Sequence, residues 1–417
     1  MQPQPPSRVI VAQIGARHDY AVPRMLEGAG RLQAFYTDAN GLTGLGAWLR
    51  RLPVVRNRGR IAKLVGRIPR GVPAAKIRHT DALLRRRLRA VVGLGPEPRG
   101  YVDDDHLFDR IVAGWGFAGA DTLYAMQKHG TLILEAARRA GLRTVVDVFI
   151  TPVAHRVVAA ERDRFSDWEE PAAGGVAADL EDERTGREIE HADLLLCPGW
   201  NVVEGLASFP NAAGKAFAVV PYGCGAPFGG RRNEPVAGRI LFAGTADLRK
   251  GIHYLAMAAE LLRGKGYQFR VAGSVTDAVR RHPRAAGLNF LGRLPRERML
   301  EEFLQADVFV LPTLAEGCAS VVHEAVTAGC PVITTPAAGT LIGDMRGGLL
   351  VPERDPGALA AAIERVVSER ECRRFLAASC GELAAELTED SWCRRLLAAL
   401  ADDAPARIGA GGNLLSS

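Results

Sequence analysis

The stretch Glu316-Gly317-Cys318-Ala319-Ser320-Val321-Val322-His323-Glu324 follows the apolar run Val308–Leu311 and opens a helical pattern. A buried strand that leads through a short glycine-containing loop into a helix leaves unpaired backbone N–H groups at the helix start. Such a helix start binds anions, a diphosphate included. Glu316 and Glu324 flank it, and because carboxylates repel phosphate, we expect them to bind hydroxyl groups of the ligand. The stretch predicts a site for an anionic, hydroxyl-rich ligand.

Short apolar runs with strand character recur on both sides of this stretch, and helical patterns separate several of them. In the second half of the chain the predicted strands are Ile240–Ala243, Phe269–Ala272, Leu288–Leu291, Val308–Leu311, Val332–Thr334 and Leu349–Val351. In the first half they are Val9–Ile14, Leu123–Ala125, Thr144–Ile150, Leu194–Cys197 and Phe217–Val220. Strands that alternate with helices predict α/β domains with parallel, doubly wound sheets.

The chain length of 417 residues predicts two domains, because a single core rarely grows this large. The Gly- and Pro-rich segment 221–238 is the expected hinge. We expect a first domain at 1–225, with a long insertion at about residues 40–120, and a second at 226–385. A helix at 386–403 is expected to pack back on the first domain, and the Ala-, Gly- and Ser-rich tail 404–417 to be disordered.

The composition points to a soluble or peripheral cytoplasmic protein. Seven cysteines without C-x-x-C spacing indicate reduced thiols. The start, with Gln13 inside its first apolar run, predicts a strand and no signal peptide. No run approaches the roughly 20 apolar residues that span a bilayer.

The net charge of +6 is concentrated in one segment. Residues 50–99 hold fifteen Lys and Arg against Asp81 and Glu97. Leucines and valines at 83, 84, 88, 91 and 92 interleave with arginines at near-helical spacing, as in a helix that lies on an anionic membrane. A solvated basic face is the alternative. The segment has no aromatic residue to stack a base, so we expect no nucleic acid as partner.

Three predicted strand ends of the second half carry residues suited to a nucleotide. In an open parallel sheet, ligands bind beyond the carboxyl ends of the strands. The loop after Ile240–Ala243 holds Gly244, Thr245, Arg249 and Lys250, the next holds Gly273, and the third begins the two-glutamate stretch. Arg249 and Lys250 at a helix start oppose the helix dipole, which favours a bound anion there. The three loops predict a nucleoside diphosphate, although each charged residue alone is also compatible with a solvated surface.

The same residues resemble a known family. The stretch Glu316 to Glu324, the preceding Ala306-Asp307-Val308-Phe309-Val310-Leu311-Pro312 and the following Ala328-Gly329-Cys330-Pro331-Val332-Ile333 are similar to the signature of family-4-type retaining glycosyltransferases of the GT-B fold. Val220-Pro221-Tyr222-Gly223 resembles their linker, and Gly244 with Arg249-Lys250-Gly251 their phosphate loop. The likeness is good from about Ala192 to Val351 and holds in outline before that. It implies two Rossmann-like domains that face each other across a cleft.

The resemblance also implies roles and a substrate. Glu316 would hold hydroxyls of the donor sugar, and Glu324 the nucleoside ribose. Backbone N–H groups of Gly317, Cys318, Ala319 and Ser320, with the Arg249 and Lys250 cations, would stabilise the departing diphosphate without a metal. Arg293 would lie near the base, and Gly244, Thr245 and Gly273 would line the donor site. The donor is a nucleoside-diphosphate sugar, and no further cofactor is expected.

Two positions depart from the family pattern, and the first domain offers further candidates. Thr245 stands where the family often has Arg, and Ala319 where it usually has a second glycine. In the first domain, the loop Gly15-Ala16-Arg17-His18 is similar to a family loop near the transferred sugar, with Gly15 permitting close approach. His155 is the other candidate for catalysis, and a histidine on a helix face is its alternative reading.

Asp103-Asp104-Asp105 raises the alternative of a metal-binding D-x-D motif. That motif follows a buried strand in the other major transferase fold. Acidic residues at the start of a helix are the simpler explanation here.

The sequence leads to one hypothesis and two alternatives. We expect a retaining glycosyltransferase that moves a hexose-type sugar to a glycan, lipid-linked or small-molecule acceptor. The basic segment suggests an acceptor at the inner face of a cell membrane, in the synthesis of an envelope polysaccharide. A sugar-nucleotide epimerase or hydrolase of the same fold is one alternative. The other is a non-catalytic scaffold that binds glycan or membrane, motivated by Thr245 and Ala319.

Overall fold

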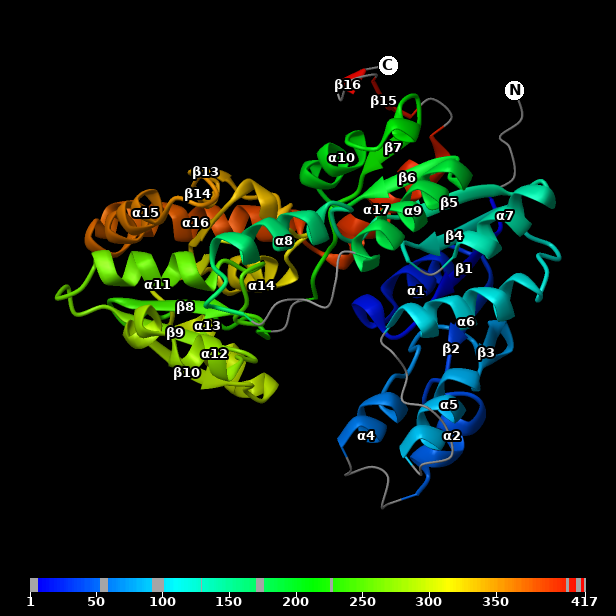
Figure 1. Cartoon of the computed structure of the whole chain (residues 1–417), viewed down its shortest axis with the longest axis horizontal. Coiled ribbons are helices and arrows are strands. Elements are labelled where there is room, and N and C mark those ends of the chain that lie inside the picture. Colours follow the sequence, from blue (N-terminus) through cyan, green and yellow to red (C-terminus); the bar gives the residue numbers. More distant parts are fainter. Residues whose placement is uncertain are drawn as a thin grey trace.

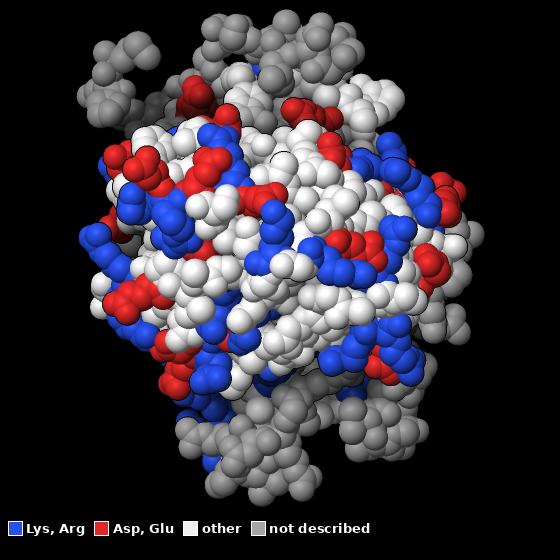
Figure 2. All heavy atoms as spheres, turned by 90° about the vertical axis from the view of Figure 1, so that its left-hand side faces the viewer, with Lys and Arg blue, Asp and Glu red and all other residues white. Residues whose placement is uncertain are grey.

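The structure is a computed structural model that describes residues 7–52, 59–91, 101–128, 130–169, 176–225, 228–402, 405–409 and 414–415. Two α/β domains lie side by side, each with helices on both faces of a sheet (Figure 1). Figure 2 looks onto the outer end of the second domain, where acidic and basic side chains are intermixed. No helix within the described ranges is both long and apolar enough to cross a membrane.

The first sheet is parallel in its main body and has the strand order β16-β15-β7-β6-β5-β4-β1-β2-β3. The order reverses between β1 and β4, as in a Rossmann domain. Its described strands are β1 (Val9–Gln13), β2 (Leu32–Asp38), β3 (Ile77–Thr80), β4 (Thr122–Met126), β5 (Arg143–Asp147), β6 (Leu194–Cys197), β7 (Ala216–Val219), β15 (Arg407–Ile408) and β16 (Leu414–Leu415). Its helices are α1 (Ala21–Gly28), α2 (Gly44–Arg50), α4 (Gly59–Val65), α5 (Ala82–Val91), α6 (Tyr101–Ala113), α7 (Thr131–Arg139), α8 (Ala154–Arg164), α9 (Val176–His191) and α10 (Trp200–Ala207).

The second sheet has the order β10-β9-β8-β11-β12-β14-β13, and it reverses between β8 and β11. Its strands are β8 (Arg239–Ala243), β9 (Gln268–Ala272), β10 (Leu288–Gly292), β11 (Val308–Leu311), β12 (Val332–Thr334), β13 (Gly343–Asp344) and β14 (Gly347–Leu350). Its helices are α11 (Ile252–Leu261), α12 (Asp277–Arg281), α13 (Arg296–Gln305), α14 (Ser320–Ala328), α15 (Pro356–Ser368) and α16 (Arg370–Glu386), and α17 (Glu389–Ala401) follows. The predicted α/β class with two doubly wound sheets is confirmed.

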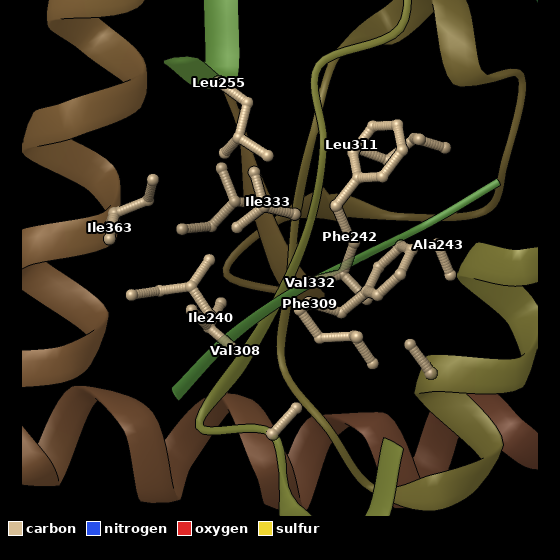
Figure 3. Packing of buried hydrophobic residues seen from close by; sticks show 14 of the residues in the cluster. Ile240, Phe242, Ala243, Leu255, Val308, Phe309, Leu311, Val332, Ile333 and Ile363 are labelled. Carbon is tan, nitrogen blue, oxygen red and sulfur yellow. The ribbon is translucent and has the colours of Figure 1, made fainter. Parts of the chain in front are cut away.

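The core of the second domain explains why its strands read as continuous apolar runs. Helices cover both faces of the sheet, so side chains on both faces of β8 and β11 are buried. Figure 3 shows strand residues such as Ile240 and Ile333 packed together with Leu255 of α11 and Ile363 of α15.

Two helices connect the domains in space. α17 returns to the first domain, where Trp392 joins the same buried cluster as Tyr20 and Met25. α8 leaves the first sheet and lies along the second domain (Figure 1), where Glu161 and Trp168 are fully buried. The chain therefore passes between the domains at α8 as well as at the 221–238 linker.

Two segments of the expected organisation contain regular structure within the described residues. The insertion at about residues 40–120 adds β3 to the edge of the first sheet and supplies α6, so it is partly built into the domain. In the tail, Arg407 pairs with Ala216 of β7 and Ile408 is buried, so this part of 404–417 is ordered. The Ile408 side chain belongs to a buried cluster of the first domain, which stabilises this short strand.

Candidate functional site

The loops after β8, β9 and β11 meet at the point where the strand order of the second sheet reverses. The Ala246 N–H donates to Ser274 O at 2.8 Å, which joins the first two loops, and the Leu314 N–H donates to Arg249 O at 2.8 Å, which joins the first and third. Gly273 allows this approach, because a Cβ there would lie 1.8 Å from Gly244 O. The topology thus brings together the residues that the sequence placed at three strand ends.

Glu316 meets both predicted cations. Its Oε1 forms ion pairs with Arg249 Nη1 and, at 2.6 Å, with Lys250 Nζ. The Thr313 hydroxyl donates to the same oxygen at 3.2 Å. These side chains are mostly buried, which strengthens their interaction relative to a surface pair. Both cations thus pair with the Glu316 carboxylate, and an anionic ligand could take its place.

The start of α14 supplies backbone donors beside this cluster. No side chain caps the helix at Ala319. The first-turn N–H groups of Ser320 and Val321 therefore point out of the helix without an intrahelical acceptor. The Ala319 N–H, by contrast, donates to Ala338 O at 2.9 Å, and the Cys318 side chain packs in the core of the first domain. Of the backbone donors that the sequence suggested at 317–320, the Ala319 N–H is therefore already paired within the protein.

Glu324 and Ser320 line a cleft of about 1000 Å³ between the domains. Burial raises the pKa of the Glu324 carboxyl, and the nearby Arg296 cation opposes this shift. The opposite wall is formed by the first domain, the linker and α17, through residues that include Arg17, His18, Arg24, Gly223 and Trp392. A ligand that reached Glu324 from the cleft would face both domains.

The first-domain wall carries a strained loop. His18, Asp19 and Tyr20 have φ of 49°, 51° and 59°, three successive left-handed residues of which none is glycine. Such conformations cost free energy and persist only when surrounding structure imposes them. Here the His18 ring packs on Tyr222 and Trp392. Burial, with the Arg17 charge, lowers the pKa of His18 to about 4, so the imidazole is neutral at pH 7.

The first domain also holds the backbone of Glu316 in place. Asn201 Nδ2 donates to Glu316 O at 2.7 Å, and the Thr151 N–H donates to the same oxygen at 3.2 Å. Gly317 forms a β-bridge with Ile150, and a Cβ at Gly317 would lie 1.9 Å from Phe149 O. Both domains therefore determine where the Glu316 carboxylate points.

The remaining predicted residues lie at several places. The Gly15 N–H donates to Asp38 Oδ1 at 2.9 Å beside the cleft. Thr245 Oγ1 accepts from the Ser274 hydroxyl at 3.3 Å. Arg293 is exposed after β10, next to Gly292, whose carbonyl accepts from Gly273 N–H.

His155 lies apart from the Glu316 cluster, with its Nε2 at 3.0 Å from Asp182 of α9. Asp104 pairs with Arg87 at 2.6 Å, and Asp105 lies 3.6 Å from Arg184. Among the described residues no group of three or more His, Cys, Asp or Glu side chains is arranged to hold a metal ion.

Three contacts at the site were not foreseen, and each depends on folding. Thr313 and Asn201 contact Glu316, as described. Glu169, which follows α8, accepts from the Leu248 N–H of the loop after β8 at 2.6 Å. Thr313 could have been found as a polar residue at the end of β11. Nothing in the local sequence signals Asn201 or Glu169.

Comparison with known proteins assigns a family to the second domain. A family model described as "Glycosyl transferases group 1" matches residues 237–369. Residues 237–369 are a group 1 glycosyltransferase domain. The loops of this glycosyltransferase domain that meet at Glu316 all lie within the matched range.

Relatives match parts of the chain. Glycogen synthase of Mycobacterium tuberculosis is 26% identical over 231 residues, which cover 52% of this chain and 55% of the relative. D-inositol 3-phosphate glycosyltransferase of Geodermatophilus obscurus is 38% identical over 86 residues, 20% of this chain and 19% of the relative. The chain thus spans about half the length of the first of these curated relatives and less of the second.

Solved structures match nearly the whole chain. Sucrose-phosphate synthase from Thermosynechococcus elongatus superimposes with a TM-score of 0.63 at 17% identity, covering 93% of this chain and 97% of that one. HepE of Anabaena, in complex with UDP and glucose, gives 0.60 at 12% identity, covering 94% and 98%. At these identities the likeness shows the fold alone, which is GT-B.

Proposed function

We propose that this protein is a glycosyltransferase that moves a hexose-type sugar from a nucleoside-diphosphate sugar to an acceptor hydroxyl, with retention at the anomeric carbon. The observation that carries the proposal is the Glu316 carboxylate held by Arg249 and Lys250, at the point where three strand ends meet. The group 1 glycosyltransferase match over residues 237–369 and the GT-B fold support it.

The residues of the cluster suit the bonds that change. The bond between the anomeric carbon and the diphosphate oxygen breaks, a bond from the acceptor oxygen to that carbon forms, and the acceptor proton leaves with the diphosphate. Negative charge develops on the diphosphate, where the Arg249 and Lys250 cations and the first turn of α14 stabilise it. Because these charges are fixed in the protein, the reaction requires no metal.

The carboxylates recognise the donor. Once the diphosphate pairs with Arg249 and Lys250, the Glu316 carboxylate is free to accept hydrogen bonds from sugar hydroxyls. Glu324, one turn into α14, accepts from the ribose. The acceptor enters from the cleft wall formed by the first domain, and we propose a glycan, a lipid-linked intermediate or a small molecule for it. Solved complexes of HepE contain UDP or UDP-glucose, which makes uridine nucleotides the first probes.

A binding screen tests the donor class. Thermal unfolding and calorimetry are measured with UDP-, GDP-, ADP- and TDP-glucose, with EDTA present to test metal independence. Ligand at 100 times its Kd adds about 2.7 kcal/mol to stability. We expect one base to stabilise the wild type and Glu324→Gln to weaken that response. Glu183→Gln, at an exposed carboxylate on α9, is the control.

The outcomes separate the alternatives. If no nucleotide binds, the proposal fails and a non-catalytic scaffold remains. Turnover of the bound donor without any acceptor would instead indicate an epimerase or hydrolase. With an acceptor in hand, nuclear magnetic resonance of the product reports the anomeric configuration, and inversion would contradict the retaining mechanism.

A further inference from the structure

One end of the first domain exposes an apolar and basic surface. α2 packs its Leu45 and Leu49 against a small cluster shared with α4 and α5, which includes Leu64 and Leu84. Trp48, three positions after Leu45, lies at the edge of this packed face and is 56% exposed, with Leu42 at 38% and Leu52 at 37%. We call Leu42, Trp48, Arg50, Arg51 and Leu52 the α2 tip.

The spacing of these residues places the key side chains together. Arg51 and Leu52 continue the turn just after α2, because their N–H groups donate to Trp48 O at 3.0 Å and Leu49 O at 3.1 Å. They follow Trp48 by three and four positions, so the three side chains gather at the C-terminal end of α2. An exposed tryptophan beside an exposed leucine and an arginine combines a ring that can enter a lipid headgroup layer with a charge that attracts anionic headgroups. A singly exposed apolar residue would need no such explanation.

The charge around the tip has one sign. Residues 42–91 contain fourteen Lys and Arg and a single acidic residue, Asp81. The Asp81 carboxylate already accepts a hydrogen bond from the Leu45 N–H at 3.0 Å. Within the described ranges, a set of tip-side cations forms no ion pair with a carboxylate, namely Arg50, Arg51, Lys63, Arg85 and Arg89. At the outer end of the second domain, by contrast, basic and acidic side chains are intermixed (Figure 2).

The structure excludes the surface that the sequence suggested. Leu83 and Leu84 of α5 are only 3% exposed, and Leu88 packs on the cluster with α2 and α4. Arg86 and Arg87 both contact Asp104 of α6. The leucines of α5 therefore face the protein and are not available to enter a membrane, whereas Val92 of the predicted pattern lies outside the described residues. The α2 tip is the surface that remains available.

A short chain of contacts links this end of the domain to the cleft. Arg67, just after α4, lies 3.4 Å from Asp38 Oδ2, and Asp38 Oδ1 accepts from the Gly15 N–H. Gly15 belongs to the loop that continues into Arg17 and His18 at the cleft wall. A surface bound at the α2 tip would thus lie on the same domain as the acceptor side of the cleft.

We propose that the α2 tip docks on an anionic phospholipid bilayer, with Trp48 and Leu52 in the headgroup layer and Arg50 and Arg51 on anionic headgroups. This inference goes beyond the proposed transfer reaction and does not depend on it. Docking would hold the acceptor side of the cleft near the lipid surface. The opposite sign of the tip and the bilayer is the reason for choosing this partner.

Vesicle sedimentation of the full chain tests the proposal. The probes are vesicles of phosphatidylcholine with 30% phosphatidylglycerol and vesicles of phosphatidylcholine alone, at several salt concentrations. We expect binding to the anionic vesicles that weakens with added salt. Arg50→Gln with Arg51→Gln should lower the partition coefficient roughly thirty-fold, the effect of two charges near the surface. Trp48→Ala should lower it several-fold, and Trp48→Phe should restore most of the loss.

Matched controls separate the tip from general charge and hydrophobicity. Arg280→Gln with Arg281→Gln removes the same two charges from α12 of the second domain. Trp200→Ala removes a tryptophan that is 53% exposed on α10. Both controls should bind as the wild type does. Equal loss in the control and tip variants, equal binding to neutral vesicles, tighter binding to single-stranded RNA than to vesicles, or no vesicle binding would each overturn the proposal. Nucleotide affinity, measured in parallel, reports separately on the transfer site.

Discussion

At the scale of the residue, Glu316 has two roles that compete. Without ligand, its carboxylate neutralises part of the charge of Arg249 and Lys250. A bound diphosphate would take over that role and leave Glu316 to the sugar. The carboxylate that we propose to recognise the donor sugar therefore also serves as a counter-ion of the two cations in the absence of ligand.

This competition predicts opposite effects of Glu316→Gln on stability and on UDP binding. The variant removes the carboxylate with which two mostly buried cations form ion pairs, so the free energy of unfolding should fall by about 1–3 kcal/mol. UDP should bind at least as tightly as to the wild type, because no carboxylate competes for the cations. The preference for UDP-sugar over UDP should be lost. Urea unfolding and calorimetry measure these quantities.

Glu324→Gln is the comparison for this prediction, since Glu324 does not contact the cations. It should weaken UDP as much as UDP-sugar. A tenfold loss of UDP affinity in Glu316→Gln would contradict the proposed competition.

His18 makes the stability of the chain sensitive to pH. Its pKa of about 4 in the folded protein lies below the ordinary value of 6.5. The folded state thus binds fewer protons, so the stabilising contribution is present above pH 6.5 and is lost as the pH falls towards 4. Between pH 7 and pH 5, the wild type should lose about 2 kcal/mol more than His18→Asn, because asparagine tolerates the left-handed backbone and does not titrate. Urea unfolding at both pH values measures the difference, and parallel curves for the two proteins would contradict it.

At the scale of the element, α8 is a helix of the first half of the chain that is anchored in the second domain. Glu161 Oε2 lies 2.9 Å from Arg354 Nε, and its Oε1 lies 3.1 Å from His253 Nε2 and accepts from the Tyr254 hydroxyl. Burial alone would raise the pKa of this carboxyl, but the three hydrogen bonds outweigh it and lower the pKa to about 2. Glu161 is therefore ionised at neutral pH.

Removing that carboxylate should release α8 from the second domain. Glu161→Ala leaves the buried His253 ring and Tyr254 hydroxyl without their hydrogen-bond partner, which costs about 1–3 kcal/mol for each unsatisfied group. Glu183→Ala removes an exposed partner of Arg187 on α9 and should cost under about 1 kcal/mol. Urea unfolding followed by far-ultraviolet circular dichroism compares the two variants. Equal losses would show that α8 is not anchored through Glu161.

Most of the strands that the sequence predicted are buried on both faces, and the edge strand β10 is an exception. Val308–Leu311 and Leu194–Cys197 are apolar throughout and were found at their observed bounds. Ile77–Thr80 was missed because it is an edge strand with Arg78 and His79 in its middle. Arg407–Ile408 is too short for any periodicity, and only its pairing with β7 shows it to be a strand.

Some contacts at the candidate site could likewise be predicted from the sequence, and others could not. The meeting of Glu316 with Arg249 and Lys250 could be predicted, because parallel strands bring their carboxyl ends to one edge of the sheet. The contacts of Asn201, Glu161 and Glu169 could not, because they join segments far apart in the chain through domain packing. His155 was named for its position after a strand, but the start of α8 turns it towards Asp182.

At the scale of the whole molecule, the two domains are joined close to the proposed chemistry. Asn201 and Thr151 bind the carbonyl of Glu316, and Ile150 pairs with Gly317. Any closing motion about the 221–238 linker must preserve or remake these contacts, and the same holds for α8. The position of the loop that holds Glu316 and Gly317 in the second domain therefore depends on the position of the first domain.

Gly317→Ala tests this coupling, because the added methyl group would lie 1.9 Å from Phe149 O, a backbone atom that cannot rotate away. The domains must separate locally, so the free energy of unfolding should fall by about 1–3 kcal/mol, the usual cost of overpacking. Gly381→Ala in α16 is the matched control, since nothing lies within 4 Å of its added methyl group. Because alanine favours a helix interior over glycine, that control should stabilise the protein by roughly 0.5–1 kcal/mol.

In Gly317→Ala, sugar transfer should fall more than UDP affinity, because the cations and the start of α14 belong to the second domain alone. Urea unfolding, calorimetry with UDP and a transfer assay give the three values, and an unchanged transfer rate would show that the contact at Gly317 is not needed for the reaction.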